Sequence, residues 1–192
     1  MNSSTNETYM HPLFTGRLTD EQEAIVRNFV MGYNVHDLGS GQLGLAMKLV
    51  ELGAHTVTAV DKEYSHRLFY SPHPSITLVG EYFEEYARHG HFIDVALVSW
   101  PEVYNQQGLE LLLRYARTVI YLGTNFDGTA CGSAEMFNHL VQREVLALVP
   151  HKWNSLIVYG QRVQGSRKLL PEEYAALHRD SAYFKFGEDL DL

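Results

Sequence analysis

The chain of 192 residues has one cysteine, Cys131, and few of the features that mark secreted, membrane or metal-binding proteins. A single cysteine excludes an internal disulfide and fits a reducing compartment. The histidines are scattered without the paired spacing of a zinc site, so we expect no metal. No apolar run approaches the roughly 20 residues that span a bilayer, and residues 1–8 lack the basic and apolar regions of a secretory signal. These absences predict a cytoplasmic protein without a membrane partner.

Positive charge is also scarce. The chain has 15 Lys and Arg residues against 23 Asp and Glu residues, which gives a formal net charge of −8. Affinity for nucleic acid depends largely on Lys and Arg side chains that displace counterions from phosphates. The composition therefore disfavours a nucleic-acid partner and favours a small molecule or a protein side chain.

The length and the absence of an internal repeat or linker predict a single domain over residues 1–192. Residues 1–17 are expected to form a partly disordered leader, residues 18–30 an amphipathic helix, and residues 34–192 the sheet domain. Thr19 and Gln22 have the spacing of a capping box at the start of that helix.

Beyond the first helix, short apolar runs alternate with segments of helical periodicity. The predicted strands are Asn34–Leu38, Thr56–Val60, Ser75–Val79, Ile93–Val98, Thr118–Leu122, Ser155–Tyr159 and, last, Ala182–Phe186. The predicted helices between them are Leu43–Leu52, Tyr82–Arg88, Leu109–Ala116 and Ser133–Leu148. Strands that alternate with helices form parallel β-α-β units, so we predict an α/β fold of the doubly wound, Rossmann-like type, a three-layer sandwich around a mostly parallel sheet of about seven strands.

Ligands of such sheets bind at the carboxyl ends of the strands, near the point where strand order reverses. The first strand runs there into a turn of sequence DLGSGQLG, which begins at Asp37. Gly39 and Gly41 allow a tight turn and a close approach of a ligand to the backbone. Asp61 follows the second strand, where a carboxylate can accept hydrogen bonds from ribose hydroxyls. Strand, glycine turn, helix and acid together predict a nucleotide-type ligand.

Two cofactors compete for this turn. Gly39, Gly41 and Gly44 have the G-x-G-x-x-G spacing of NAD-binding domains, where a pyrophosphate rests on the helix N-terminus. The Asp37 carboxylate argues against a pyrophosphate because it would repel that group. S-adenosylmethionine has no phosphate, and its ammonium and sulfonium favour an acid at this position.

The turn resembles the first-strand signature of the class I S-adenosylmethionine-dependent methyltransferases, an acid followed by glycines at alternate positions. Asp37, Gly39 and Gly41 match that signature, whereas Leu43 stands where the family usually has a third glycine. The resemblance extends over roughly residues 33–123. It implies a Rossmann-like methyltransferase fold whose last strand is antiparallel.

Carried over position by position, the resemblance implies a cofactor site along the ends of the first strands. It would place Asp37, Gly39, Ser40 and Gly41 around the methionine portion, Asp61 on the ribose, and Glu81 and Tyr82 near the adenine. Lys62 and Ser99 complete the predicted cofactor-binding set. For Glu81 the alternative is a solvated acid that is favoured by the helix dipole.

The segment after the fourth strand, SWPEVYN, is where these enzymes commonly contact the methyl acceptor. It is similar to the Asn-Pro-Pro-Tyr motif of enzymes that methylate amino groups but has Trp100 at the asparagine position, which weakens that reading. Trp100, Tyr104 and Asn105 are candidate substrate-binding residues, since the aromatic side chains can stack on a planar group or hold a cation. The alternative is that the aromatic residues cover the edge of the sheet.

Catalytic candidates are few. In the polar loop after the fifth strand, Asp127 could serve as a general base and Cys131 as a nucleophile, and Tyr104 is a further candidate. His36 is expected to be a core histidine. His89 and His91 are expected at the end of the sheet opposite the site, without a chemical role.

The sequence thus favours an S-adenosylmethionine-dependent methyltransferase that acts on a small molecule or a protein side chain. One alternative is an NAD-dependent oxidoreductase or NAD-binding domain. Another is a non-catalytic module that retains the fold and the cofactor but not turnover, so that enzymatic activity itself is left open.

Overall fold

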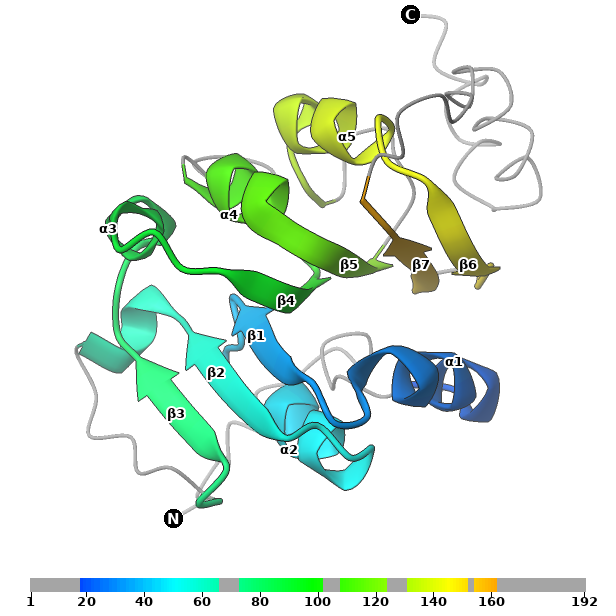
Figure 1. Cartoon of the computed structure of the whole chain (residues 1–192), viewed down its shortest axis with the longest axis horizontal. Helices are drawn as coiled ribbons and strands as arrows, with labels where there is room; N and C mark the ends of the chain where they lie inside the picture. The colour runs from blue at the N-terminus through cyan, green and yellow to red at the C-terminus, as the bar shows by residue number, and fades with distance from the viewer. Residues whose placement is uncertain (1–17, 66–72, 102–107, 124–130, 152–153, 162–192) are drawn as a thin grey trace, which may run out of the picture.

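The computed structural model describes residues 18–65, 73–101, 108–123, 131–151 and 154–161 (Figure 1). The strands are β1 (Asn34–Leu38), β2 (Thr56–Val60), β3 (Ile76–Val79), β4 (Ile93–Ser99), β5 (Ala116–Gly123), β6 (Val145–Val149) and β7 (Ser155–Tyr159). The helices are α1 (Asp20–Val30), α2 (Gly44–Glu51), α3 (Phe83–Arg88), α4 (Leu109–Tyr115), α5 (Ala134–Leu140) and the short 3-10 helix η2 (Lys62–Ser65).

The strands form one sheet of seven in the order β3-β2-β1-β4-β5-β7-β6. The first five are parallel, and β7 runs antiparallel to both of its neighbours, β5 and β6. Strand order reverses at β1, which pairs with β2 on one side and β4 on the other. The chain therefore has the predicted doubly wound, Rossmann-like architecture, and the carboxyl ends of β1 and β4 define its switch point.

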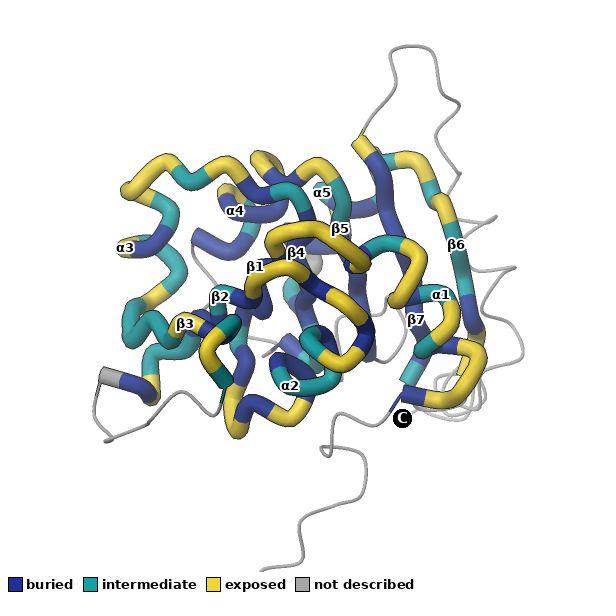
Figure 2. The backbone as a smooth tube through the Cα atoms, turned by 60° about the horizontal axis from the view of Figure 1, so that its bottom comes forward, coloured by how far each residue is buried: buried dark blue, intermediate teal, exposed yellow. Residues whose placement is uncertain are grey.

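Two apolar layers enclose the sheet. Figure 1 shows α1 and α2 on one side of the sheet and α3, α4 and α5 on the other. Val26, Val30 and Leu49 pack into the first layer, and Leu112 and Phe137 into the second. Because both faces are covered, the central strands are apolar at most positions, and they form the buried centre of the molecule in Figure 2.

The N-terminal helix has the predicted start. Thr19 Oγ accepts a hydrogen bond from the Gln22 amide (3.2 Å), and Gln22 Oε1 accepts one from the Thr19 amide (3.0 Å). Gln22 is fully buried, and its Nε2 donates to the backbone carbonyl of Asn154 (2.6 Å). The capping box therefore also attaches α1 to the segment that precedes β7.

The prediction of one long helix over residues 133–148 is wrong. Helix α5 ends at Leu140, and a turn leads into β6, which fills the sheet edge beside β7. The run Val145–Val149 is apolar at every position, and such a short run fits a strand as well as a buried helix turn. The last predicted strand, residues 182–186, lies outside the described residues. Within the part of the chain that the structure describes, no helix is long and apolar enough to cross a membrane.

Candidate functional site

A pocket of about 330 Å³ opens at the carboxyl end of the parallel strands. Its walls come from the segments that follow β1, β2, β3 and β4, together with the starts of α3 and α4. The lining residues are Leu38, Gly39, Asp61, Lys62, Glu63, Glu81, Tyr82, Phe83, Glu84, Ser99, Trp100, Pro101 and Leu109. The pocket thus lies at the switch point, where the sequence placed the ligand.

The glycine loop after β1 crosses over the end of β2. The amides of Gly39 and Ser40 both donate to the carbonyl of Val60, at 2.8 and 3.3 Å. Gly39 and Gly41 have φ values of 79° and 52°, the left-handed region that glycine adopts without strain. A side chain at Gly41 would meet nothing within 4 Å, so the backbone of the loop tip is open to a ligand.

Leu43 takes the place of the third glycine in conformation as well as in position. Its φ of 66° and ψ of 7° are left-handed, whereas Gly44 is already the first residue of α2. The leucine side chain is buried in the core between α2 and the sheet. A non-glycine residue in this region is strained by roughly 1–2 kcal/mol, and the burial of the side chain offsets that strain.

Asp61 lies against the glycine loop. Its Oδ2 accepts the Gly41 amide (2.9 Å) and its Oδ1 accepts the Glu63 amide (2.9 Å). Each carboxylate oxygen has a second lone pair, so Asp61 can still accept hydrogen bonds from a ligand in the pocket.

Ser40 and Tyr64 form a second connection between these segments. The Tyr64 hydroxyl lies 2.7 Å from Ser40 Oγ and donates to the Gly41 carbonyl (2.8 Å). Both side chains are buried. Ser40, which the sequence predicted as a cofactor contact, therefore directs its hydroxyl to Tyr64, a residue that the sequence analysis had not singled out.

Asp37 is fully buried on β1 and does not line the pocket. Within the described part of the chain neither carboxyl oxygen has a hydrogen-bond partner. Burial and, after it, the nearby Asp61 carboxylate raise the pKa of Asp37 to about 7. A buried acid without a partner disfavours any further negative charge in its neighbourhood.

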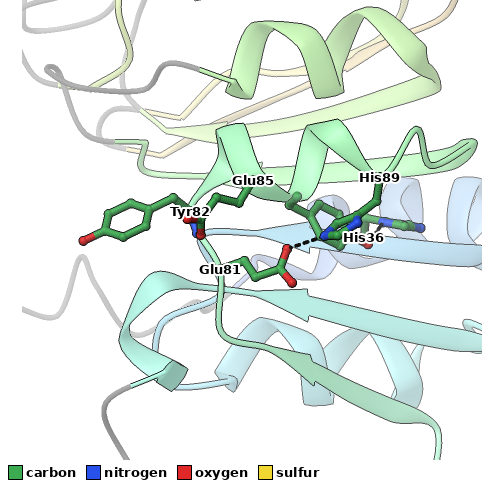
Figure 3. A network of polar contacts seen from close by, with 6 residues as sticks. His36, Glu81, Tyr82, Glu85 and His89 are labelled. Carbon is green, nitrogen blue, oxygen red and sulfur yellow. Dashed lines mark hydrogen bonds and ion pairs between the residues drawn. The ribbon is translucent and has the colours of Figure 1, made fainter.

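Glu81 and Tyr82, predicted at the adenine end, both line the pocket. Figure 3 shows the Glu81 side chain turned toward His89, whose Nε2 lies 3.0 Å from Glu81 Oε2, while the Tyr82 ring points the other way. His89 was expected at the far end of the sheet without a role. The short helix α3, of six residues, leaves His89 beside the carboxylate of a pocket residue, but His89 itself does not line the pocket.

Ser99, the last residue of β4, and Trp100, which follows it, also line the pocket. Trp100 is half-buried and has a φ of 46°, unusual for a bulky residue. Two hydrogen bonds hold it in place, from its amide to the Leu122 carbonyl (2.8 Å) and from its Nε1 to Asn154 Oδ1 (2.9 Å). Such strain is often found at functional sites.

Other predicted residues lie elsewhere. Cys131 is buried in the core with its Sγ 2.9 Å from the Tyr121 hydroxyl, which does not fit a nucleophile open to substrate. His36 is a core residue as predicted: its Nδ1 lies 3.0 Å from the Tyr86 hydroxyl. Burial and, as the second cause, the nearby His91 lower the pKa of His36 to about 4. Tyr104, Asn105 and Asp127 lie outside the described residues.

The pocket wall is strongly acidic. Its charged members are one lysine and four carboxylates, namely Lys62, Asp61, Glu63, Glu81 and Glu84. The sequence analysis did not identify three residues of the pocket wall, namely Glu63, Phe83 and Glu84. Their spacing from the strand ends resembles that of ordinary solvated helix starts. A pocket of this sign favours a ligand with net positive charge over one that carries phosphates.

No family model and no curated protein matches the chain. Among solved structures, a "putative RNA methyltransferase" from Pyrococcus horikoshii is similar over 76% of this chain and 82% of its own, with 15% identity and a TM-score of 0.55. A SAM-dependent O-methyltransferase from Thermotoga maritima matches over 79% and 68%, with 11% identity and a TM-score of 0.51. A SAM-dependent methyltransferase from Streptococcus mutans matches over 76% of this chain and 50% of its own, with 15% identity and a TM-score of 0.52.

These likenesses show the fold: the chain has the class I, Rossmann-like fold of S-adenosylmethionine-dependent methyltransferases. The RNA and oxygen acceptors in the names of these similar proteins belong to those proteins, and they differ from one another. The fold alone therefore selects no methyl acceptor.

Proposed function

We propose that the protein binds S-adenosylmethionine in the pocket and transfers its methyl group to a small molecule or a protein side chain. The observation that carries the proposal is the acidic pocket beside an open glycine loop. S-adenosylmethionine has a net positive charge, which four pocket carboxylates attract. The same charges oppose the pyrophosphate of NAD.

The residues present fit the parts of that cofactor. Gly39 lines the pocket and Gly41 is exposed at the loop tip, so we propose this turn for the methionine portion. Asp61, at the end of β2, is placed for the ribose hydroxyls, with Lys62 beside it. Glu81 and Tyr82 stand at the end of β3, where a carboxylate can accept from an amino group and a half-exposed ring can cover a base.

When bound, this cofactor supplies an electrophilic methyl group on a sulfonium. The protein then has to hold an acceptor in line with that methyl group and exclude water, and such positioning alone can supply much of the rate enhancement. Trp100 directly follows β4 and lines the pocket, and it is a candidate to contact the acceptor. Asp127 and Tyr104 remain proposals for a base.

The test is thermal unfolding and calorimetric titration of the purified protein with S-adenosylmethionine, S-adenosylhomocysteine, NAD and NADP. A ligand at 100 times its dissociation constant adds about 2.7 kcal/mol to the free energy of unfolding. We expect this from the two sulfur nucleosides only, and we expect Asp61→Ala to abolish it. Asp20→Asn, which removes an exposed carboxylate of α1, is the charge-matched control and should bind normally.

Stabilisation by NAD would overturn the proposal. Binding of the sulfur nucleosides without transfer of a labelled methyl group to any small molecule or protein of a cell extract would instead favour the non-catalytic module.

A further inference from the structure

The segment after β2 holds the Gly41 residue from both sides. The Gly41 N–H donates to Asp61 Oδ2 (2.9 Å), and the Gly41 carbonyl accepts from the Tyr64 hydroxyl (2.8 Å). A tyrosine hydroxyl has one proton, so the 2.7 Å contact between Tyr64 and Ser40 must be donated by the serine. The hydrogen bonds therefore run in one direction, from Ser40 through Tyr64 to the Gly41 carbonyl.

Tyr64 is suited to a permanent donor role. Its side chain is 8% exposed and packs in the core beneath the loop. Burial raises the pKa of Tyr64 to about 12, so the hydroxyl keeps its proton at any physiological pH. The loop contact does not depend on the protonation of a neighbour, because the proton that reaches Gly41 is Tyr64's own.

The loop tip needs such a contact because it is exposed and has no side chain of its own to pack. Gly41 is exposed, and a Cβ there would meet no atom within 4 Å. Glycine loses more backbone freedom on ordering than any other residue, and Leu43 adds strain at the end of the same turn. The hydrogen bond from the Gly41 amide to Asp61 and the one from the Tyr64 hydroxyl to the Gly41 carbonyl restrain this turn in place of side-chain packing.

We propose that Tyr64 is a positioning residue for the cofactor: together with Asp61 it holds the Gly39–Gly41 turn in its ligand-binding conformation before the ligand arrives. This inference rests on the proposed function, since it concerns the same site. Its physical basis is preorganisation. A ligand that meets an ordered loop does not have to order it, and the affinity rises accordingly.

The decisive variant is Tyr64→Phe, which keeps the buried ring and removes only the hydroxyl. We expect the dissociation constant for S-adenosylhomocysteine, measured by calorimetry, to rise roughly tenfold, as expected for loss of about one net hydrogen bond in the free loop. Ser40→Ala leaves the Tyr64 to Gly41 bond intact and should raise it only about two- to threefold. Tyr115→Phe, at an exposed tyrosine of α4, is the matched control and should change nothing.

Amide hydrogen exchange of the ligand-free protein tests the clamp without any cofactor. Tyr64→Phe should speed exchange at the amides of residues 39–43 and leave β5 and β7 unchanged, whereas a general loss of stability would speed all of them. Saturation with S-adenosylhomocysteine should return the loop to wild-type exchange. If Tyr64→Phe does not fold, Asp61→Ala, which removes the other hydrogen bond of the clamp, carries the same exchange comparison in the ligand-free protein.

Unchanged loop exchange in Tyr64→Phe would overturn the clamp, whatever the protein binds. Faster loop exchange with unchanged affinity would overturn its role in preorganisation. If the wild-type protein binds no sulfur nucleoside, the proposed function fails, and the exchange data still show whether Tyr64 orders the loop.

Discussion

The side chain of Gln22 donates a 2.6 Å hydrogen bond to the backbone carbonyl of Asn154, a residue 132 positions further along the chain. The side chain of Asn154 in turn accepts from Trp100 Nε1 in the pocket wall (2.9 Å). The capping box of α1 is thereby connected through one asparagine to a strained residue of the candidate site.

Gln22→Ala removes a fully buried side chain that bonds the Thr19 amide and the Asn154 carbonyl. We expect the free energy of unfolding to fall by about 2 kcal/mol, because two partly buried backbone groups lose their hydrogen-bond partner. Urea denaturation measures this. Glu21→Ala, at an exposed neighbour in the same helix turn, should change stability by less than about 0.5 kcal/mol; an equal loss in both variants would contradict the assignment.

Gly108→Ala tests how closely α4 approaches α3. A Cβ at Gly108 would lie 2.6 Å from the Cα of Glu84 and the carbonyl carbon of Phe83, and the residue has a φ of 90°. We expect a loss of more than about 3 kcal/mol and weaker ligand binding, since Phe83 and Glu84 line the pocket.

The control for this change is Gly90→Ala. Gly90 has a similar φ of 66°, but a Cβ there meets nothing within 4 Å. Its variant should lose only about 1 kcal/mol from backbone strain. Comparable losses in the two variants by thermal unfolding would show that the steric contact with α3 is unimportant.

Arg143 joins three parts of the second half of the chain. Its guanidinium donates to the carbonyls of Leu113 and Ala116 at the end of α4, to Gly160 after β7 and, at 3.4 Å, to Arg117. Arg143→Ala should destabilise the protein by about 3 kcal/mol, because several carbonyls lose a charged donor.

Arg143→Lys should recover only part of that loss, since an ammonium cannot reproduce the planar set of donors. Arg27→Ala, at an exposed arginine of α1, is the control and should be nearly neutral. Full recovery by lysine in denaturant titrations would show that charge alone, without the fork geometry, is sufficient.

The ionisation of Asp37 and that of His36 should make the free energy of unfolding depend on pH in opposite directions. The pKa of Asp37 rises on folding from 3.8 to about 7, so between these values the folded state binds more protons and stability falls as pH rises. At about 1.4 kcal/mol per pKa unit, the free energy of unfolding that is lost in this way reaches roughly 4 kcal/mol above pH 7. The pKa of His36 falls on folding from 6.5 to about 4, so its contribution rises with pH between those values.

The two effects oppose each other between about pH 4 and pH 6.5 and should leave the wild-type protein with a shallow profile there. Asp37→Asn should unmask a stability that increases with pH, and His36→Gln one that decreases. Urea denaturation from pH 4.5 to 7.5 measures both. Parallel profiles for the three proteins would show that neither group changes its pKa on folding.

Much of the fold was predictable because the central strands are covered on both faces. Strands such as Ile93–Ser99 are apolar at nearly every position, and they end where chemistry-bearing residues such as Asp61 and Glu81 begin. Parallel topology then brings those ends to one edge. The same uniform apolarity made Val145–Val149 ambiguous, and there only pairing with β7 decides for a strand.

The details of the site were less accessible. Leu43 in place of a glycine indicated a weakened motif, but the sequence could not show that a leucine adopts the glycine conformation when its side chain is buried. The pairing of Tyr64 with Ser40 spans 24 residues and depends on the exact course of η2. The one available signal was a tyrosine three residues after Asp61.

The bond between Gln22 and Asn154 also orders events during synthesis. Gln22 of the capping-box helix is translated 132 residues before its hydrogen-bond partner Asn154. At roughly 5–20 residues per second, α1 waits about 7 to 26 s before it can complete this contact. During that interval the apolar face of α1, which includes Val26 and Val30, has not completed its native packing. Until then, this apolar face of α1 is a surface that chaperones of nascent chains can cover.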